Sequence, residues 1–559
     1  MKEKIATMLK GHIHLSEESI IKLLEIPPTP ELGDFALPCF ALIKIYKKDP
    51  TSIAKDLATK IKSSLVEKVE AKGPYINFFL NRKILAKQIL TKILGEKENY
   101  GQGKKSNETI MIEFSQANTH KAFHVGHVRG TLLGESLARI TEWAGRKVIR
   151  VNYQGDIGMH VAKWLWYYTT FRNHERLREN EAWIASLYVD ALKKLAEHPE
   201  YQKDSDEINR KLDQRSDKKL LALWKKTRQL SLNAFKPIYK ELDTWFDHCF
   251  FESRLEEPAK QITQKLLEKG IAQISEGATI VDLEKYNLGV WVLLRRDGSV
   301  LYSAKDLALA EKKFNEFKIN KSIYVIGSEQ QLHIAQLFKT LELTGISQVK
   351  KCHYVPISLV RLPHGKMSSR TGDNILYSQF KAELVHHALA EIKSRHDLNQ
   401  KDAKKRALTI ALAALKYSFL KQDTNKTIVF DKIEALRFDG NTGPYMLYTY
   451  ARARSILRKA RYKQKKKIAL KTNLEEREKS LILKLASFPE VTQQAYASYA
   501  PALIANYAYE LAQLFNEFYH ATKVIGSENE FVRLALVDAT AQIIKNSLFL
   551  LTIPVLERM

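Results

Sequence analysis

The feature that most constrains the fold is a change of hydrophobic period that begins at Thr109. Residues 109–115, TIMIEFS, place Ile110, Ile112 and Phe114 at alternate positions, as in a strand, whereas residues 125–145 carry apolar side chains at helical spacing. Residues 147–153, KVIRVNY, then predict a second strand. A strand, a helix and a strand in this order predict a parallel sheet with a right-handed crossover, whose ligands bind at the carboxyl ends of the strands.

The same alternation returns later in the chain. Residues 289–303 predict a hairpin that turns at Asp297-Gly298. A predicted helix (304–314) and strand (322–327) follow it, and then a second helix (329–343) and a second strand (353–360). The segment between the two halves, about 162–269, is charged and helical in pattern, without β alternation. We therefore expect a helical insertion that splits the sheet-forming region.

The regions that flank the sheet predict other kinds of domain. Residues 1–80 combine amphipathic helical stretches with a short extended run, YINFFL, which is typical of a small α+β domain. The chain after Asp373 is almost entirely helical in pattern. We expect a multidomain protein of α/β and all-α parts: an N-terminal domain (1–80), a linker helix (81–108), a Rossmann-like parallel-sheet domain (109–375, with the insertion at 162–269) and a helical domain (376–559).

Charge indicates a class of partner. The chain has 89 Lys and Arg against 63 Asp and Glu, a formal net charge of +26, which favours a polyanion such as nucleic acid. The basic run at 451–467, ARARSILRKARYKQKKK, is a candidate surface for it. A solvated basic surface that only aids solubility explains the composition equally well, so the motifs have to decide.

Cysteine use and hydropathy indicate the compartment. Cys39, Cys249 and Cys352 lie far apart and form no CxxC pair, which gives no basis for a disulfide framework and favours a reducing cytoplasm. Charges occur throughout MKEKIATMLKGHIHLSEES, where a signal peptide needs an apolar run, and Lys416 interrupts the otherwise apolar ALTIALAALKYSFL. We therefore expect no export signal and no membrane span.

The most informative stretch is SQANTHKAFHVGHVRG, residues 115–130, at the junction of the first strand and its helix. His124 and His127 lie where unpaired N–H groups and the helix dipole attract phosphate, and imidazoles can donate hydrogen bonds to phosphate oxygens. Gly126 lets a flat adenine ring approach the backbone. The histidines could instead bind zinc or belong to the core, but no Cys or further ligand lies at a spacing typical of zinc, so we expect no metal site.

A second polar loop, RLPHGKMSSRTGD at 361–373, follows the last predicted strand. Lys366 in this loop suits the stabilisation of a leaving pyrophosphate, because a cation there offsets the charge that develops during nucleotidyl transfer. In isolation the loop could be no more than a mobile basic surface segment. The earlier GQGKKS is not a Walker phosphate loop, because Glu98 occupies the position that requires glycine.

HVGH and KMSSR together resemble the paired signatures of class I aminoacyl-tRNA synthetases. Within that class the chain resembles the arginyl-tRNA synthetases, and the resemblance covers nearly the whole sequence. It rests on GDFALPCFAL, GPYINFF, SQANTHKAFHVGH, VNYQGDIG, LYSAKD, KTIVFDKIEALRFDGNTGPYMLYTYARA and PVLERM.

The resemblance implies a two-step reaction. Arginine attacks the α-phosphate of ATP to give arginyl-adenylate and pyrophosphate, and the terminal adenosine of tRNA(Arg) then takes the arginyl group. Mg²⁺ accompanies the ATP, and the first step ordinarily requires bound tRNA. The implied partners are tRNA(Arg), L-arginine and ATP, and we expect a cytoplasmic monomer that has no contact with membranes.

The resemblance also implies which residues act on ATP. His124 and His127 contact its phosphates, Gly126 lies under adenine, and Lys366, Met367 and Ser368 form the mobile loop. Ser369 replaces the second lysine of the class KMSKS loop, and in this family a lysine upstream of the histidines, here Lys121, shares the stabilisation of phosphate. His160, after GDIGM, stands where the family usually has glutamine, which puts the role of that position in doubt.

Arginine recognition needs a carboxylate and neighbouring acceptors, because a planar guanidinium must replace its hydration. The family pattern implies Asn118 at the α-amino end of the substrate, Tyr302 and Asp306 in the LYxxxD positions, and Gln330 after the SIYVIG strand. Glu113 is a second carboxylate candidate. The alternative to a role in arginine binding is ordinary packing for Tyr302 and Gln330. For Asp306 the alternative is that it caps a helix.

For tRNA, residues 1–80 resemble a domain that reads the D-loop corner, with Tyr75 and Asn77 as contacts to unpaired bases. The helical C-terminal domain resembles an anticodon-binding domain, in which Tyr448, Tyr519 and the basic stretch after Arg452 could stack on bases or contact phosphate. Aromatic residues at helical spacing are, however, more often part of a core. The rival hypotheses are a class I synthetase for another amino acid, a nucleotidyltransferase without tRNA and a noncatalytic RNA-binding relative.

Overall fold

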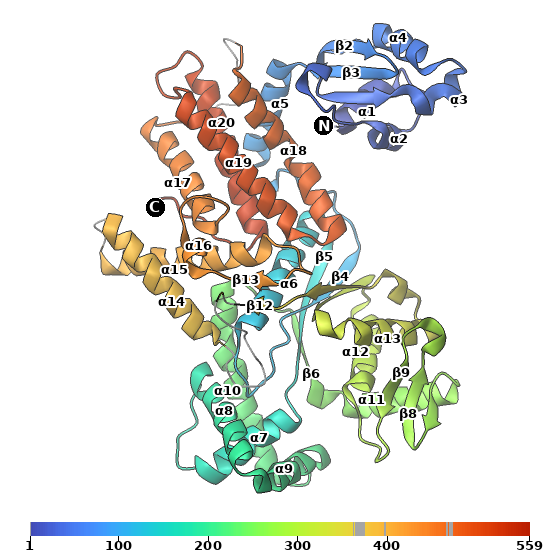
Figure 1. Cartoon of the computed structure of the whole chain (residues 1–559), viewed down its shortest axis with the longest axis vertical. Helices are drawn as coiled ribbons and strands as arrows, with labels where there is room; N and C mark the ends of the chain where they lie inside the picture. The colour runs from blue at the N-terminus through green and yellow to red at the C-terminus, as the bar shows by residue number, and fades with distance from the viewer. Residues whose placement is uncertain (1, 362, 364–374, 396–398, 465–467, 469–472) are drawn as a thin grey trace.

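The structure, a computed structural model, describes residues 2–361, 363, 375–395, 399–464, 468 and 473–559. Its centre is one parallel sheet of five strands in the order β11-β10-β4-β5-β6 (Figure 1). The strands are β4 (Thr109–Glu113), β5 (Lys147–Gln154), β6 (His248–Phe251), β10 (Lys321–Gly327) and β11 (His353–Ile357). With the α+β unit and the helical C-terminal part described below, the sheet confirms the expected fold class.

The middle of the sheet forms as the sequence predicts. Ile110, Met111 and Ile112 of β4 are fully buried, as expected for a parallel strand that is covered on both faces. Helix α6 (Val125–Trp143) connects β4 to β5 and packs close to β4, because Gly134 has no side chain: a Cβ there would lie 2.0 Å from the ring of Phe114. The crossover therefore brings the start of α6 to the carboxyl end of β4.

Residues 162–269 are helical, with one strand as the exception. The helices that precede β6 form a lobe at the bottom of Figure 1. The helices are α7 (Met159–Phe171), α8 (Glu181–Glu197), α9 (Gln202–Gln214) and α10 (Lys218–Leu242). The expectation that 162–269 contains no strand is wrong at β6, which pairs parallel with β5 as an edge strand. Only Phe250 of its four residues is fully buried, so it lacks the alternation by which a strand is recognised.

The lobe at the lower right of Figure 1 follows β6. It contains α11 (Glu256–Glu268), the antiparallel strands β7 (Gln273–Ser275), β8 (Ala278–Asp282) and β9 (Val290–Leu294), then α12 (Tyr302–Phe317) and α13 (Gln331–Leu343). The expected hairpin at 289–303 is present, because Leu294 pairs antiparallel with Val300 and Gly298 adopts a positive φ of 77° at the turn. Helices α12 and α13 lead into and out of β10.

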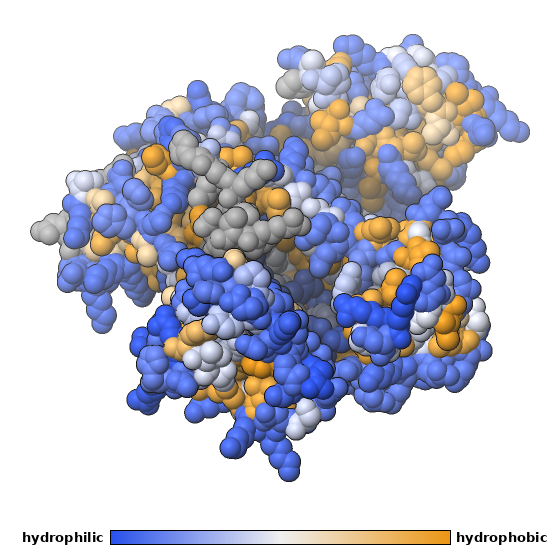
Figure 2. All heavy atoms as spheres, turned by 60° about the horizontal axis from the view of Figure 1, so that its bottom comes forward, coloured by the Kyte–Doolittle hydropathy of each residue, from blue (hydrophilic) through white to orange (hydrophobic). Residues whose placement is uncertain are grey.

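The first residues form a separate α+β unit at the upper right of Figure 1. Its antiparallel sheet has the order β1-β3-β2. Its elements are α1 (Lys2–Lys10), α2 (Glu17–Leu23), β1 (Phe35–Pro38), α3 (Ile43–Tyr46), α4 (Pro50–Lys60), β2 (Val66–Lys72) and β3 (Tyr75–Leu80). Figure 2 shows hydrophobic side chains gathered on this unit, where Phe40 is 53% exposed.

Helices form the rest of the described chain. Helix α5 (Arg82–Glu96) leaves the N-terminal unit and packs against the C-terminal helices. These are α14 (Tyr377–Arg395), α15 (Gln400–Leu420), α16 (Lys432–Leu436), α17 (Gly443–Lys459), α18 (Glu476–Ser498), α19 (Pro501–Ala521) and α20 (Glu530–Leu550). Two short strands, β12 (Val360–Arg361) and β13 (Ile428–Val429), pair in parallel. No helix among the described residues is both long and apolar enough to cross a membrane.

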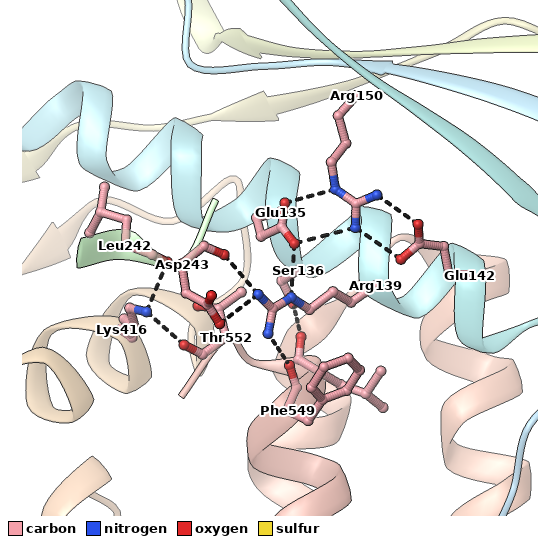
Figure 3. A network of polar contacts seen from close by, with 11 residues as sticks. Glu135, Ser136, Arg139, Glu142, Arg150, Leu242, Asp243, Lys416, Phe549 and Thr552 are labelled. Carbon is pink, nitrogen blue, oxygen red and sulfur yellow. Dashed lines mark hydrogen bonds and ion pairs between the residues drawn. The ribbon is translucent and has the colours of Figure 1, made fainter. Parts of the chain in front are cut away.

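A buried network of charges fixes α6 against the C-terminal helices (Figure 3). Glu135 of α6 accepts from the guanidinium groups of Arg139 at 2.8 Å and Arg150 at 2.9 Å. Arg139 also donates to the carbonyl of Phe549 in α20 at 3.0 Å and to Asp243 after α10 at 2.8 Å. Because the network joins α6 to β5, to the residue after α10 and to a carbonyl of α20, it fixes the helix that begins at the histidine pair.

Lys416 of α15 completes this network from the C-terminal side (Figure 3). Its fully buried ammonium donates to the carbonyls of Leu242 at 2.8 Å and Thr552 at 2.6 Å. Leu242 is the last residue of α10, and Thr552 follows the end of α20. Burial lowers the pKa of Lys416 to about 7. This lysine, which in the sequence only interrupted an apolar run, thus joins two helix ends whose carbonyls lack partners within their helices.

Candidate active site

A cavity of about 600 Å³ opens at the carboxyl ends of β4 and β10. The chain runs from β4 outward to β5 and β6 and returns on the other side of β4 as β10, so the cavity lies where the strand order reverses. Figure 2 shows the surface hollowed between the lobe of α7–α10 and the lobe of α11–α13. The lining residues discussed below are Glu113, Asn118, His124, Gly126, His127, Arg129, Tyr153, Glu252, Tyr302, Asp306, Lys313, Gln330 and His333.

The histidine pair forms the N-terminus of α6. Nδ1 of His124 accepts from the backbone N–H of Gly126 at 3.1 Å, and Nδ1 of His127 accepts from the N–H of His124 at 3.2 Å. The two rings stack with centroids 3.8 Å apart. Because both Nδ1 atoms are acceptors, the neutral rings carry their protons on Nε2, which leaves two N–H donors for an anion.

The environment keeps both imidazoles neutral. Burial lowers the pKa of His124 to about 4, and the charge of Lys121 acts in the same direction. Burial, His124 and Lys121 together hold the pKa of His127 well below its ordinary value. Near neutral pH the pair therefore acts as hydrogen-bond donors at a helix N-terminus and not as cations.

Gly126 is needed for the shape of this end of the cavity. A Cβ at this position would lie 2.9 Å from Cε1 and 3.0 Å from Nδ1 of His124. Any side chain at this position would therefore displace the first imidazole. The open backbone agrees with the expected approach of a flat ring.

Lys121 lies near the histidines but does not line the cavity. Its ammonium is 5.2 Å from the ring centre of Tyr188 in α8, and burial lowers its pKa. His160, the departure from the family pattern, begins α7 nearby. Burial lowers the pKa of His160 to about 3, and its Nε2 has no hydrogen-bond partner among the described residues. The predicted Lys366, Met367 and Ser368 lie outside the described residues.

Three carboxylates, Glu113, Glu252 and Asp306, also line the cavity. Asp306 on α12 receives a hydrogen bond from Nε2 of His333 at 2.7 Å, and Tyr302, one turn earlier, is 62% exposed. Glu252 accepts from Lys305 at 2.8 Å. Burial raises the pKa of the nearby Tyr153 phenol, and the charges of Asp306, Glu252 and Glu113 raise it further. This concentration of carboxylates favours a cationic ligand.

Glu113 is less available to such a ligand than Asp306. One of its carboxylate oxygens forms a buried ion pair with Lys313, and the other accepts from Nε2 of Gln116 at 2.9 Å. Burial acts to lower the pKa of Lys313, but the carboxylate of Glu113 outweighs it and raises that pKa. The charges of these two cavity-lining side chains thus neutralise each other.

The remaining residues predicted for arginine also line the cavity. Gln330 follows β10, and Asn118 lies in the loop between β4 and α6. A Cβ on Gly155 would lie 2.4 Å from Oδ1 of Asn118, so glycine leaves room for this amide. The structure therefore brings Glu113, Asn118, Tyr302, Asp306 and Gln330 around the same cavity as His124 and His127.

The residues predicted for tRNA lie on two distant surfaces. In the N-terminal unit, the Tyr75 ring meets the exposed Phe40 edge to face, with centroids 6.0 Å apart. Asn77 is only 4% exposed, because β3 is the central strand of its sheet, so it has little surface to offer a base. At the C-terminal helices, Arg452 lies 4.5 Å from the ring centre of Tyr448 and 5.5 Å from that of Tyr519.

Sequence reasoning missed several residues of the cavity. Arg129 is buried, and among the described residues its guanidinium donates to backbone carbonyls alone, including those of Leu359 at 3.2 Å and Lys426 at 2.9 Å. Burial lowers the pKa of Arg129 to about 10. This side chain connects α6 to the segments that precede β12 and β13. Neither Arg129 nor His333 lies at a spacing that indicates its long-range partner, although Arg129 is inside the recognised HVGHVRG.

Comparison with known proteins agrees with this geometry. The family model described as the class I (R) tRNA synthetase catalytic domain matches residues 89–432, and the arginyl-tRNA synthetase N-terminal domain model matches 1–80. The chain belongs to the arginyl-tRNA synthetase family. The model described as the DALR anticodon binding domain matches residues 446–559.

Relatives of the family resemble the chain over its full length. The arginine–tRNA ligase of Clostridium perfringens is 36% identical over 571 aligned residues, which cover 100% of both chains. The arginyl-tRNA synthetase structure from Thermus thermophilus has a TM-score of 0.83 and 26% identity, over 100% of this chain and 99% of that one. The Plasmodium falciparum arginyl-tRNA synthetase, with a TM-score of 0.79 and 22% identity, shares the fold over 100% of this chain and 99% of its own.

Proposed function

We propose that this protein is an arginine–tRNA ligase, which activates L-arginine with ATP and transfers it to the 3′ end of tRNA(Arg). The observation that carries this proposal is a single cavity lined both by neutral imidazole donors at a helix N-terminus and by carboxylates. A triphosphate suits the imidazole donors and a guanidinium suits the carboxylates. Family membership supplies the reaction that joins two such ligands.

In the activation step, the carboxylate of arginine attacks the α-phosphorus of ATP, and the bond to the bridging oxygen of the leaving pyrophosphate breaks. We assign His124 and His127 to the ATP phosphates, where their Nε2–H groups stabilise developing negative charge. Gly126 leaves the space beside the first imidazole open for adenine. Lys121, Lys366, Met367 and Ser368 are proposed to contact or stabilise the phosphates.

Mg²⁺ is proposed to arrive bound to ATP. Among the described residues there is no cluster of three or more His, Cys, Asp or Glu side chains that could hold a metal ion. A hard cation that brings its own phosphate and water ligands does not require such a cluster. When bound, it would neutralise phosphate charge.

We propose that Asp306 receives the guanidinium, with Glu113, Tyr302 and Gln330 around the side chain and Asn118 at the α-amino end. Asp306 is the first choice because Glu113 is already paired with Lys313. A charge-assisted hydrogen bond from a guanidinium to a carboxylate is among the stronger polar contacts in proteins.

For tRNA we propose two contact surfaces, on residues 1–80 and 376–559, joined by the linker helix 81–108 to the catalytic residues 109–375. Tyr75 and the exposed Phe40 suit stacking on unpaired bases, as do Tyr448 and Tyr519 beside Arg452. The net charge of +26 favours such a polyanion. We further propose that the protein acts as a monomer in the cytoplasm.

The test is aminoacylation of total tRNA by the purified protein with labelled L-arginine and MgATP. The expected result is arginine esterified to the 3′ adenosine of tRNA(Arg) alone, identified by sequencing the charged RNA. Charging with another amino acid would refute the specificity. RNA binding without any charging would favour a noncatalytic relative.

A further inference from the structure

His333 of α13 lies between a tryptophan and the carboxylate that we assign to the guanidinium. Its Nδ1 accepts from Nε1–H of Trp291 in β9 at 3.2 Å, and its Nε2 lies 2.7 Å from Oδ2 of Asp306 in α12. Trp291 is 4% exposed, so the first of these contacts is shielded from water. The ring of Tyr302 covers the imidazole, with centroids 4.8 Å apart.

These contacts determine the protonation state of the imidazole. The indole N–H of Trp291 is a donor only, so Nδ1 of His333 must be unprotonated. The single proton of the neutral ring is therefore on Nε2, from which it is donated to Asp306. Trp291 thus sets the tautomer, and His333 delivers a hydrogen bond to one chosen carboxylate oxygen.

The second oxygen of Asp306 is left for the cavity. Within the described part of the chain, no donor is found on Oδ1, while Oδ2 is held by the imidazole. Because a carboxylate rotates freely about its terminal torsion, a fixed Oδ2 also fixes the direction of Oδ1. A preorganised acceptor binds more tightly because its ordering cost is not incurred again on binding.

We propose that His333 is a positioning residue for the amino-acid substrate, which holds Asp306 in the orientation that receives the guanidinium, and that Trp291 fixes the tautomer of His333 for this task. The inference rests on the proposed function, because it concerns the same cavity. It adds two residues, from β9 and α13, that do not themselves touch the guanidinium. Their effect is specific to arginine and does not extend to ATP, since the imidazole pair that we assign to the phosphates lies at the start of α6, and not on β9, α12 or α13.

Two substitutions of His333 separate positioning from packing. His333→Gln keeps an acceptor for Trp291 and an N–H donor for Asp306, whereas His333→Phe keeps the aromatic volume and loses both. Positioning predicts that the phenylalanine variant raises KM for arginine by about 10- to 100-fold, the effect of one hydrogen bond to a charged group, while KM for ATP stays within about twofold. The glutamine variant should remain within about threefold of the wild type for both substrates.

The experiment is steady-state aminoacylation with full-length protein, saturating tRNA and titrated arginine or ATP, with thermal midpoints measured for each variant. His248→Gln on the edge strand β6, outside the cavity, is the matched control and should behave as the wild type. Trp291→Phe provides a second measurement, which also raises KM for arginine and leaves KM for ATP unchanged.

The inference is supported if His333→Phe raises KM for arginine and His333→Gln does not. It is overturned if both variants keep the wild-type KM for arginine, or if His333→Phe keeps it and His333→Gln does not. It is also overturned if KM for arginine and KM for ATP rise equally. If one His333 variant does not fold, the arginine-specific effect of Trp291→Phe decides. Wild-type protein that fails to charge tRNA with arginine refutes the proposed function itself, a result distinct from an active wild type whose His333 variants show no arginine effect.

Discussion

Replacement of Asp306 by asparagine is the sharpest perturbation of the proposed arginine site. The amide keeps the size of the carboxylate and can still accept from His333 through its oxygen. It removes the negative charge and turns an N–H₂ group toward the cavity, where a guanidinium also presents only donors. The substitution therefore replaces the attraction between the carboxylate and the guanidinium by a contact between two groups of hydrogen-bond donors.

The structure bounds the size of this effect. Since Oδ2 already accepts from His333, a single oxygen of Asp306 is available, and the loss is that of one charge-assisted hydrogen bond and not of a two-point fork. Such a bond contributes about 2 to 3 kcal/mol, which corresponds to a fall of roughly 30- to 160-fold in kcat/KM for arginine. KM for ATP should change by less than about twofold, because the phosphates bind at the imidazole end.

The assay is tRNA charging with titrated arginine, beside the control Asp297→Asn. Asp297 lies in the hairpin turn and accepts from the N–H of Ser299 at 2.9 Å, a role that asparagine can take over. The control should match the wild type. A normal kcat/KM for arginine in Asp306→Asn, or an equal loss for ATP, would refute the assignment of Asp306.

Three further predictions follow from the α6 end of the cavity. Gly126→Ala should raise KM for ATP by at least about tenfold with a smaller effect on arginine, since its Cβ would meet the His124 ring at 2.9 Å; an unchanged KM would contradict the proposed ATP position. Arg129→Lys should lower the free energy of unfolding in urea by about 2 to 4 kcal/mol, because one ammonium cannot serve the carbonyls of both segments that precede β12 and β13; a neutral result would refute that role. The folded-state pKa values of His124, about 4, and His160, about 3, lie below the ordinary value, so the unfolded chain binds more protons below about pH 6.5. Thermal midpoints should fall as the pH is lowered from 6.5 toward 4, and a midpoint that rose over this range would contradict the burial of these rings.

The sequence predicts those parts of the fold that local patterns determine. Strand β4 was recognisable because Ile110, Ile112 and Phe114 lie at alternate positions, and β10 because SIYVIG is largely apolar, as in a parallel strand covered on both faces. Strand β6 was not, because an edge strand of four residues needs little apolar surface and depends on β5 for its pairing. The helical pattern around it therefore concealed the fifth strand of the sheet.

For the site, the sequence could identify residues within recognisable motifs but not the contacts between them. His124 and His127 were predictable because a strand followed by a helix forms an anion site at the junction. The pairing of Glu113 with Lys313, 200 positions later, depends on the register of β4 against α12 and on burial. The sequence predicts Asn77 as a contact to an unpaired base, whereas Asn77 is 4% exposed on β3, which pairs with β1 on one side and β2 on the other.

The central claim is that this cavity activates arginine with ATP. The most direct measurement is ATP–pyrophosphate exchange with each of the twenty amino acids, with and without total tRNA from the source organism. The account predicts exchange with arginine alone, dependent on the addition of tRNA. Exchange with a different amino acid would contradict the acidic pocket as a guanidinium site, and no exchange under any condition would contradict the assignment of a ligase.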